Sequence, residues 1–209
     1  MTRPLVISDC DEVLLHMVRH FRDWLGSEHE IDFTLEGNPF AESMIVRATG
    51  QTIGIDGVHG YLEGFFDTQM SRQTAIAGAI EAMTELQRDA DVVILTNLTD
   101  KRNADRRRQL REHGLDVPVY TNQGPKGGAL QRIIAEYAPS RAVFIDDIAG
   151  HHQSVFELAP DVRRLHLCGE PAIAPHVPCA LTAGHADARI DNWQQALPWL
   201  LDTLHGDTK

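Results

Sequence analysis

The feature that most restricts how this chain can fold is a series of short, unbroken apolar runs separated by amphipathic segments. The apolar runs cover residues 5–7, 91–95, 117–120, 141–145, 164–167 and 188–190. Runs of this length are typical of parallel strands that are buried on both faces. Apolar residues with helical spacing lie between them, over residues 75–88, 100–113, 126–137 and about 192–204. The alternation predicts an α/β fold, a Rossmann-like parallel sheet with helices on both faces.

One block of the chain does not follow this alternation. Its pattern is helical over residues 16–25 and 57–66 and strand-like over residues 31–35 and 44–47. We therefore predict a small inserted α or α+β cap formed by residues 15–68. The remaining residues, 1–14 and 69–209, then form the α/β core domain.

Composition excludes several classes of partner. Lysine and arginine number 19 against 30 aspartates and glutamates, which gives a net charge of −11. A chain this acidic lacks the basic surface that nucleic acids and anionic membranes require, so neither is an expected partner. Three cysteines are too few for a disulfide framework, and the first apolar run is broken too early for a signal peptide. We expect a cytoplasmic protein, and the sequence does not indicate an oligomeric state.

Polar residues follow the predicted strands at the edge where open α/β sheets bind ligands. Four separate segments contribute them: Asp9 and Asp11, Thr96 and Asn97, Lys126, and Asp146 and Asp147. Converging carboxylates repel one another unless a cation lies among them, and oxygen-rich sites of this kind favour Mg²⁺. The sequence therefore predicts a magnesium and phosphoryl site at this edge.

Each of these groups has a chemical role if the ligand is a phosphoryl group. Asp9 could act as a carboxylate nucleophile, and Asp11, two residues further on, as a general acid and base. The Thr96 hydroxyl and the backbone amides near Asn97 could bind phosphate oxygens, and Lys126 could supply positive charge. Plainer alternatives are a helix cap for Thr96 and an exposed helix-start position for Lys126.

These four motifs, in this order, resemble the haloacid dehalogenase (HAD) superfamily of phosphohydrolases. The resemblance rests on Asp9-x-Asp11-x-Val13 after a strand, then Thr96, then Lys126, and then the acidic pair Asp146-Asp147. It implies that Asp9 forms an aspartyl-phosphate and also ligates the metal. It also implies that Asp11 is the acid/base and gives its backbone carbonyl to the metal.

The resemblance assigns the remaining motifs as well. Thr96 and Lys126 would bind the phosphate, Asp146 would ligate Mg²⁺ directly, and Asp147 would do so directly or through water. The second aspartate argues against dehalogenation, because superfamily members that cleave carbon–halogen bonds lack it. Two positions depart from the family pattern: Glu12 stands where glycine is usual, and Ile148 stands where a small polar residue is common.

A cap in this position implies a lid over a small-molecule site. Its aromatic residues could hold a nucleotide base, but burial in the core of the cap itself is the more usual fate of such side chains. The aromatic residues are Phe21, Trp24, Phe33, Phe40, Tyr61, Phe65 and Phe66.

Two further groups of residues are assigned structural roles. The basic run of Lys101, Arg102 and residues 106–108 is interpreted as a solvated helix face. His151 and His152 follow the acidic pair, and we expect surface or structural roles for them. Adjacent helical residues point about 100° apart, so at most one of the two can reach the site.

The sequence thus predicts a Mg²⁺-dependent phosphatase that hydrolyses a small phosphorylated metabolite, of the nucleoside monophosphate or sugar phosphate class, through an aspartyl-phosphate. One alternative is a non-catalytic protein of the same fold that binds phosphate or metal, which Glu12 would favour. Another is a phosphotransferase or mutase that uses the same aspartyl-phosphate.

Overall fold

A single parallel sheet forms the centre of the computed structural model, which describes residues 2–34 and 43–206. Its strand order is β5-β4-β1-β6-β7-β8, so the first strand of the chain lies in the middle. The strands are β1 (Leu5–Ser8), β4 (Asp91–Thr96), β5 (Val119–Thr121), β6 (Ala142–Asp146), β7 (Arg163–His166) and β8 (Ala188–Arg189). The predicted parallel sheet is confirmed.

Helices cover both faces of this sheet, as predicted. They are α3 (Ala79–Leu86), α4 (Asn103–Glu112), α5 (Gly127–Tyr137), α6 (Ala149–Leu158) and α7 (Trp193–His205). Alternate strand residues face opposite layers: Val6 packs in the cluster with α3, α4 and α7, whereas Leu5 and Ile7 pack with α5 and α6. Among the described helices, none combines the length and the apolar character needed to cross a membrane.

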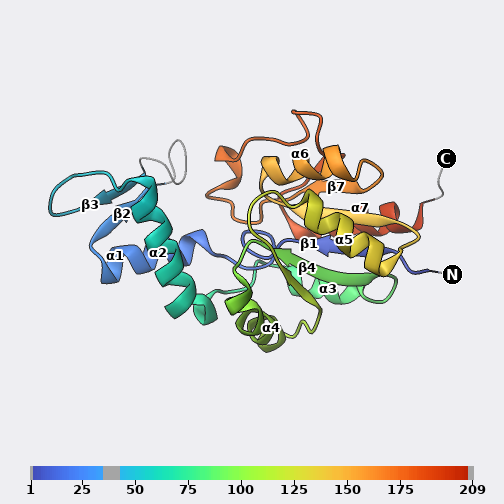
Figure 1. The fold of residues 1–209 in the computed structure, drawn as a ribbon, viewed down its shortest axis with the longest axis horizontal. Helices are drawn as coiled ribbons and strands as arrows, with labels where there is room; N and C mark the ends of the chain where they lie inside the picture. Colours follow the sequence, from blue (N-terminus) through green and yellow to red (C-terminus); the bar gives the residue numbers. More distant parts are fainter. Residues whose placement is uncertain (1, 35–42, 207–209) are drawn as a thin grey trace.

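Residues 15–68 are called the inserted segment below. The elements that the structure describes within it form a lobe beyond the carboxyl ends of the strands (Figure 1). Its elements are α1 (Val18–Glu28), β2 (Ile31–Phe33), β3 (Met44–Val46) and α2 (Ile55–Thr68). The two strands pair antiparallel, with Ile31 opposite Val46. The predicted order of helix, two paired strands and helix is therefore confirmed in this lobe.

The aromatic residues of the inserted segment have different fates. Phe21, Phe33 and Phe65 are buried in an apolar cluster of the lobe itself, as the plainer interpretation predicts. Phe66 instead lies at the edge of that cluster and lines a cavity described below. Phe40 lies outside the described residues.

Several contacts join the inserted segment to the rest of the chain. The stretch after β7 contributes Cys168, Ile173 and Ala174 to the apolar cluster of the lobe. Where the chain enters and leaves the lobe, the two stretches lie side by side: the His16 amide donates to the Thr74 carbonyl at 2.9 Å. The lobe and the stretch after β7 therefore pack as one apolar unit.

Candidate active site

The strand order brings the predicted site residues to one edge of the sheet. β1 lies between β4 and β6, and these three strands end next to Asp9, at Thr96 and at Asp146. The Asp9 amide donates to the Ile145 carbonyl at 2.8 Å, which fixes the start of the loop after β1. Lys126 reaches the same place from the residue before α5.

Lys126 lies between two of the carboxylates. Its Nζ is 2.7 Å from Asp9 Oδ1 and 2.7 Å from Asp146 Oδ2, and its side chain is fully buried. The alternative of an exposed lysine is therefore wrong. Burial opposes the charge, but attraction by Asp146 and Asp9 outweighs it, so the pKa of Lys126 lies above its ordinary value. The lysine is a permanent cation at the centre of the site.

Three carboxylates cluster around this lysine and could hold a metal ion. Ligand oxygens of Asp9, Asp146 and Asp147 lie within 4.8 Å of one another. Burial raises the pKa of Asp9 to about 7 and raises the pKa of Asp147 well above its usual range. Asp146 is also buried, but the charge of Lys126 lowers its pKa. One ammonium group cannot neutralise all three groups once they are ionised, and an all-oxygen donor set fits Mg²⁺.

Asp11 does not join this carboxylate cluster with its side chain. Both of its oxygens accept from Arg106 Nη2, at 2.9 and 2.8 Å, and Gln73 Nε2 donates to Oδ1 at 2.7 Å. Arg106 is fully buried and also lies 3.2 Å from Cys10 Sγ. The Asp11 carboxylate is therefore held by two side chains that were not predicted as part of the site.

The interpretation of the basic run as a solvated face is wrong for two of its members. Arg102 and Arg106 are both buried. Arg102 is the residue just before α4, and Arg106 follows four residues later within α4. This spacing places both side chains on the side of α4 that faces the inserted segment. Arg102 donates to Asp67 and Glu63 of α2, and both guanidinium groups lie over the Phe66 ring. The four-residue spacing of Arg102 and Arg106 could have indicated that they share one buried side. The neighbouring charged residues favoured the interpretation of an exposed surface instead.

Glu12 does not face solvent. Its Oε1 accepts from the backbone amides of Met17 at 2.7 Å and Val18 at 2.5 Å, at the start of α1. Its φ of 59° is the left-handed conformation that favours glycine. Burial raises the pKa of this carboxyl to about 8, and Oε2 has no hydrogen-bond partner within the described residues. Where the resemblance leads one to expect glycine, this chain thus has a residue that adopts the left-handed backbone conformation and adds a cap for α1.

Thr96 and Asn97 differ in how they are engaged. The Thr96 hydroxyl is buried, lines the cavity and has no hydrogen-bond partner in the part of the chain that the structure describes. The Asn97 side chain donates to the Gly124 carbonyl at 3.0 Å and accepts from Asn122 Nδ2 at 2.9 Å. Thr96 therefore has an oxygen available for a ligand, whereas the side chain of Asn97 holds the loop that carries Lys126.

The two adjacent histidines are buried, so the expected surface role is wrong and the structural one is observed. His152 Nε2 lies 2.9 Å from the Asp146 carbonyl and supports the end of β6. His151 Nε2 lies 3.2 Å from Asn97 Nδ2, and burial lowers the pKa of this imidazole. Of the two, only His151 lines the cavity, in agreement with the expectation that at most one could reach the site.

A cavity of about 730 Å³ opens above these groups, between the strand ends and the inserted segment. Asp9, Asp11, Thr96 and Asp147 lie in its lining. Together with Lys126 and Asp146, which join Asp9 through the contacts described above, they form what we call the floor. The sides of the cavity, which we call the walls, are mainly apolar. The wall residues used below are Met17, Leu62, Phe66, Ile148, Ile173 and Val177.

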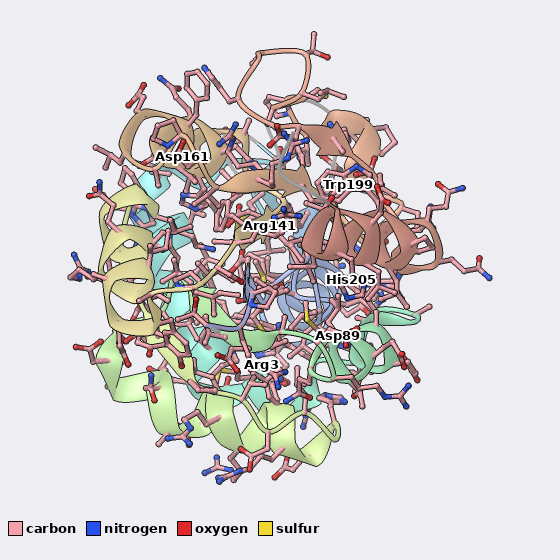
Figure 2. All side chains as sticks on the ribbon, turned by 90° about the vertical axis from the view of Figure 1, so that its right-hand side faces the viewer. Arg3, Asp89, Arg141, Asp161, Trp199 and His205 are labelled. Carbon is pink, nitrogen blue, oxygen red and sulfur yellow. The ribbon has the colours of Figure 1, made fainter. Side chains whose placement is uncertain are left out.

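A larger hollow of about 1050 Å³ lies at the opposite end of the molecule (Figure 2). Arg141, Asp161 and Trp199 contribute to its lining, next to the amino ends of the strands. It contains none of the predicted site residues. Parallel sheets bind ligands at the carboxyl ends of their strands, so the smaller cavity is the candidate active site.

Comparison with solved structures places the chain in a known fold. Neither a family model nor a curated protein matches the sequence. A haloacid dehalogenase-like hydrolase from Streptococcus pneumoniae matches with a TM-score of 0.63 and 14% identity, covering 95% of this chain and 98% of that one. A haloacid dehalogenase-like protein from Agrobacterium tumefaciens matches with a TM-score of 0.64 and 19% identity, covering 94% and 96%.

A third similar structure carries a more specific description. A predicted phosphoglycolate phosphatase from Haemophilus somnus matches with a TM-score of 0.66 and 12% identity, covering 94% of this chain and 97% of that one. Each similarity extends over nearly the whole of both chains. The chain therefore has the fold of the haloacid dehalogenase-like hydrolases, as the four sequence motifs predict.

Proposed function

We propose that this protein is a Mg²⁺-dependent phosphatase that hydrolyses a small phosphorylated metabolite through an aspartyl-phosphate. The observation that carries the proposal is the Lys126 ammonium held 2.7 Å from both Asp9 and Asp146. The Thr96 hydroxyl, which has no partner among the described residues, lines the same cavity as Asp9. A phosphoryl group needs such fixed positive charge and hydrogen-bond donors around a nucleophile. Nucleoside monophosphates and sugar phosphates are the substrate classes expected from the sequence.

The chemistry divides between two aspartates. Asp9 attacks phosphorus, so a bond forms between its carboxylate oxygen and phosphorus while the ester P–O bond breaks. Asp11 gives a proton to the departing alkoxide and then takes one from the water that hydrolyses the aspartyl-phosphate. Lys126 and Thr96 hold the phosphoryl oxygens, and the backbone amides near Asn97 assist them. Bound Mg²⁺ would supply Lewis acidity and charge neutralisation, held by Asp9, Asp146, Asp147 and the Asp11 carbonyl.

The inserted segment, residues 15–68, is proposed to act as the cap over a core made of residues 1–14 and 69–209. Met17, Leu62 and Phe66 of this lobe and its borders already line the cavity. Closure of such a lobe would exclude water from the floor. The similarity to a predicted phosphoglycolate phosphatase agrees with a small substrate.

The test is hydrolysis of 4-nitrophenyl phosphate by the purified protein. Turnover should need Mg²⁺, disappear in excess EDTA and return when Mg²⁺ is restored. Acid-quenched samples should contain a phosphorylated protein whose label is lost in hydroxylamine, as an acyl phosphate requires. Mg²⁺-dependent turnover without any labelled protein would overturn the covalent mechanism, and absence of turnover over a wide panel of phosphate esters would overturn the phosphatase.

One observation favours a second candidate, a non-catalytic protein that binds phosphate or metal. Both oxygens of the proposed acid/base Asp11 are engaged by Arg106. Tight Mg²⁺ or phosphate binding by calorimetry, without turnover, would decide for this candidate. A phosphotransferase would be recognised in product analysis, because the phosphoryl group would appear on an added alcohol and not as inorganic phosphate.

A further inference from the structure

The walls of the cavity are built from apolar side chains of two separate parts of the chain. Met17, Leu62 and Phe66 lie on the side of the inserted segment. Ile148, Ile173 and Val177 lie on the side of the core. The part of a phosphate ester that extends away from the floor would therefore be surrounded by hydrocarbon on both sides.

Lysine and arginine side chains are missing from the described lining of the cavity. The sequence of residues 35–42, LEGNPFAE, contains neither residue type. Three arginines that adjoin the lining are already paired: Arg106 with Asp11, Arg19 with Glu170 at 2.8 Å, and Arg102 with Glu63 and Asp67. A second anionic group on the substrate would enter apolar surroundings without a cationic partner, which is strongly unfavourable.

Two imidazoles are the basic side chains of the described lining. His151 is buried, lies beside Asn97, and its pKa is lowered by burial. His176 is exposed and lies at the rim. Neither provides a fixed cation in the depth of the cavity.

We infer that the substrate is a phosphate monoester whose alcohol is uncharged and mainly apolar, such as an aryl or aralkyl alcohol, with the phosphate on the floor and the alcohol against the walls. This inference rests on the proposed phosphatase. It disfavours esters with a second anionic group, such as phosphoglycolate, and it disfavours sugar phosphates, whose hydroxyl groups would lose hydrogen bonds to water. Substrates with one flat, poorly hydrated ring system are favoured.

A matched pair of esters tests the inference. Benzyl phosphate and 4-carboxybenzyl phosphate share the same ring and the same scissile bond, and they differ by one carboxylate. We expect kcat/KM for benzyl phosphate to exceed that for 4-carboxybenzyl phosphate by roughly tenfold or more, because the carboxylate is desolvated without a partner. A ratio near one, or a preference for 4-carboxybenzyl phosphate, would overturn the inference.

Substitutions at Leu62 test whether the preference for benzyl phosphate over 4-carboxybenzyl phosphate arises at the wall. Leu62→Lys places a cation on α2 where the structure has hydrocarbon, and it should reduce the ratio by roughly tenfold, through faster turnover of 4-carboxybenzyl phosphate. Leu62→Gln is the matched control, because it removes the apolar contact without adding charge. It should slow benzyl phosphate and give no gain with 4-carboxybenzyl phosphate. If the ratio of kcat/KM for the two esters were unchanged in Leu62→Lys, Leu62 would not lie against the substrate. The same would follow if Leu62→Gln gave an equal gain with 4-carboxybenzyl phosphate.

A binding measurement separates this inference from the proposed phosphatase. If the wild-type protein hydrolyses neither these two esters nor any other phosphate ester of a wide panel in Mg²⁺, the phosphatase proposal fails. Calorimetric titration of the same two esters in Mg²⁺ then decides the inference by itself. Benzyl phosphate bound roughly tenfold more tightly would support the apolar cavity, and equal or reversed affinities would overturn it.

Discussion

The floor and the walls of the candidate active site are built on opposite physical principles. On the floor, Lys126 touches two carboxylates at 2.7 Å, and almost all of the binding capacity is electrostatic. On the walls, residues such as Leu62 and Ile173 offer only hydrocarbon. The floor comes from adjacent strand ends of one sheet, whereas the walls come from the inserted segment and from the stretches that follow β6 and β7.

The difference indicates where chemistry and selectivity reside. A floor fixed by three central strands suits the one reaction proposed for it, phosphoryl transfer, on many esters. The walls can change without disturbing that floor, so they determine which alcohol is accepted. Glu12 and Arg102 lie where the two regions join, because Glu12 caps α1 and Arg102 binds α2.

The largest effect is expected at the floor, in Asp9→Asn. This change removes the nucleophile, and we expect the rate of 4-nitrophenyl phosphate hydrolysis to fall by roughly a thousandfold or more. The asparagine oxygen can still accept from Lys126, so the melting temperature should change little. Asp32→Asn is the control, since Asp32 is an exposed partner of Arg47 in the inserted segment. Comparable activity in the two variants would remove Asp9 from the mechanism.

The second effect, also at the floor, concerns stability. Lys126→Met leaves the buried carboxylates of Asp9 and Asp146 without their cation, and it should lower the free energy of unfolding by about 3–5 kcal/mol. Lys101 is an exposed lysine near Glu63 and Asp67, and Lys101→Met should cost less than about 1 kcal/mol. Urea unfolding in Mg²⁺-free buffer measures both. Equal losses would show that Lys126 does not organise the floor.

The floor could be predicted from sequence because each of its residues follows directly from local patterns. Asp9, Thr96 and Asp146 stand at the ends of apolar runs, and parallel strands that are neighbours bring their carboxyl ends together. The α/β fold could be predicted from the alternation of apolar runs and amphipathic segments alone. The same logic placed Lys126 near the strand ends, although it could not show that the side chain lies between two carboxylates.

The walls and the junctions could not be predicted in this way. Ile173 and Val177 face the inserted segment through contacts that span more than 100 residues, and no local pattern encodes them. Arg106 was assigned to solvent because a buried arginine is rare unless it has a partner, and its partner Asp11 is 95 residues away. Glu12 was identified as a departure from the family pattern. Its role as a cap could not be predicted, because it depends on where α1 begins and on the position of the Met17 and Val18 amides.

The third prediction tests the first junction through pH. Burial raises the pKa of Glu12 from 4.5 to about 8, so the folded protein retains a proton that the unfolded chain releases. The contribution of this group to stability is complete below about pH 4.5 and is lost as the pH rises through about 8. Glu12→Gln keeps an oxygen that can accept from Met17 and Val18 but cannot titrate.

The expected result is a difference between two pH profiles. Between about pH 5 and pH 8, the wild-type free energy of unfolding should fall relative to that of Glu12→Gln by on the order of a few kcal/mol. Asp9 and Asp147 titrate in both proteins, but the Glu12 charge also raises the pKa of Asp147, so the difference reports Glu12 together with its effect on Asp147. Chemical unfolding at fixed Mg²⁺ concentration measures it. Parallel profiles would mean that the Glu12 carboxyl titrates as it does in the unfolded chain.

The smallest effect is expected at the second junction, where Arg102 holds α2 against the core. Its guanidinium lies 2.6 Å from Asp67 and 2.9 Å from Glu63, and its side chain is almost fully buried. Arg102→Ala should cost about 1–2 kcal/mol, because both acids are half-exposed and regain water when the arginine is lost. Lys101→Ala removes an exposed cation near the same two acids and should cost less than about 0.5 kcal/mol. If Lys101→Ala lowered the free energy of unfolding more than Arg102→Ala does, the exposed ammonium of Lys101, and not the buried guanidinium of Arg102, would be the group that holds α2 against the core.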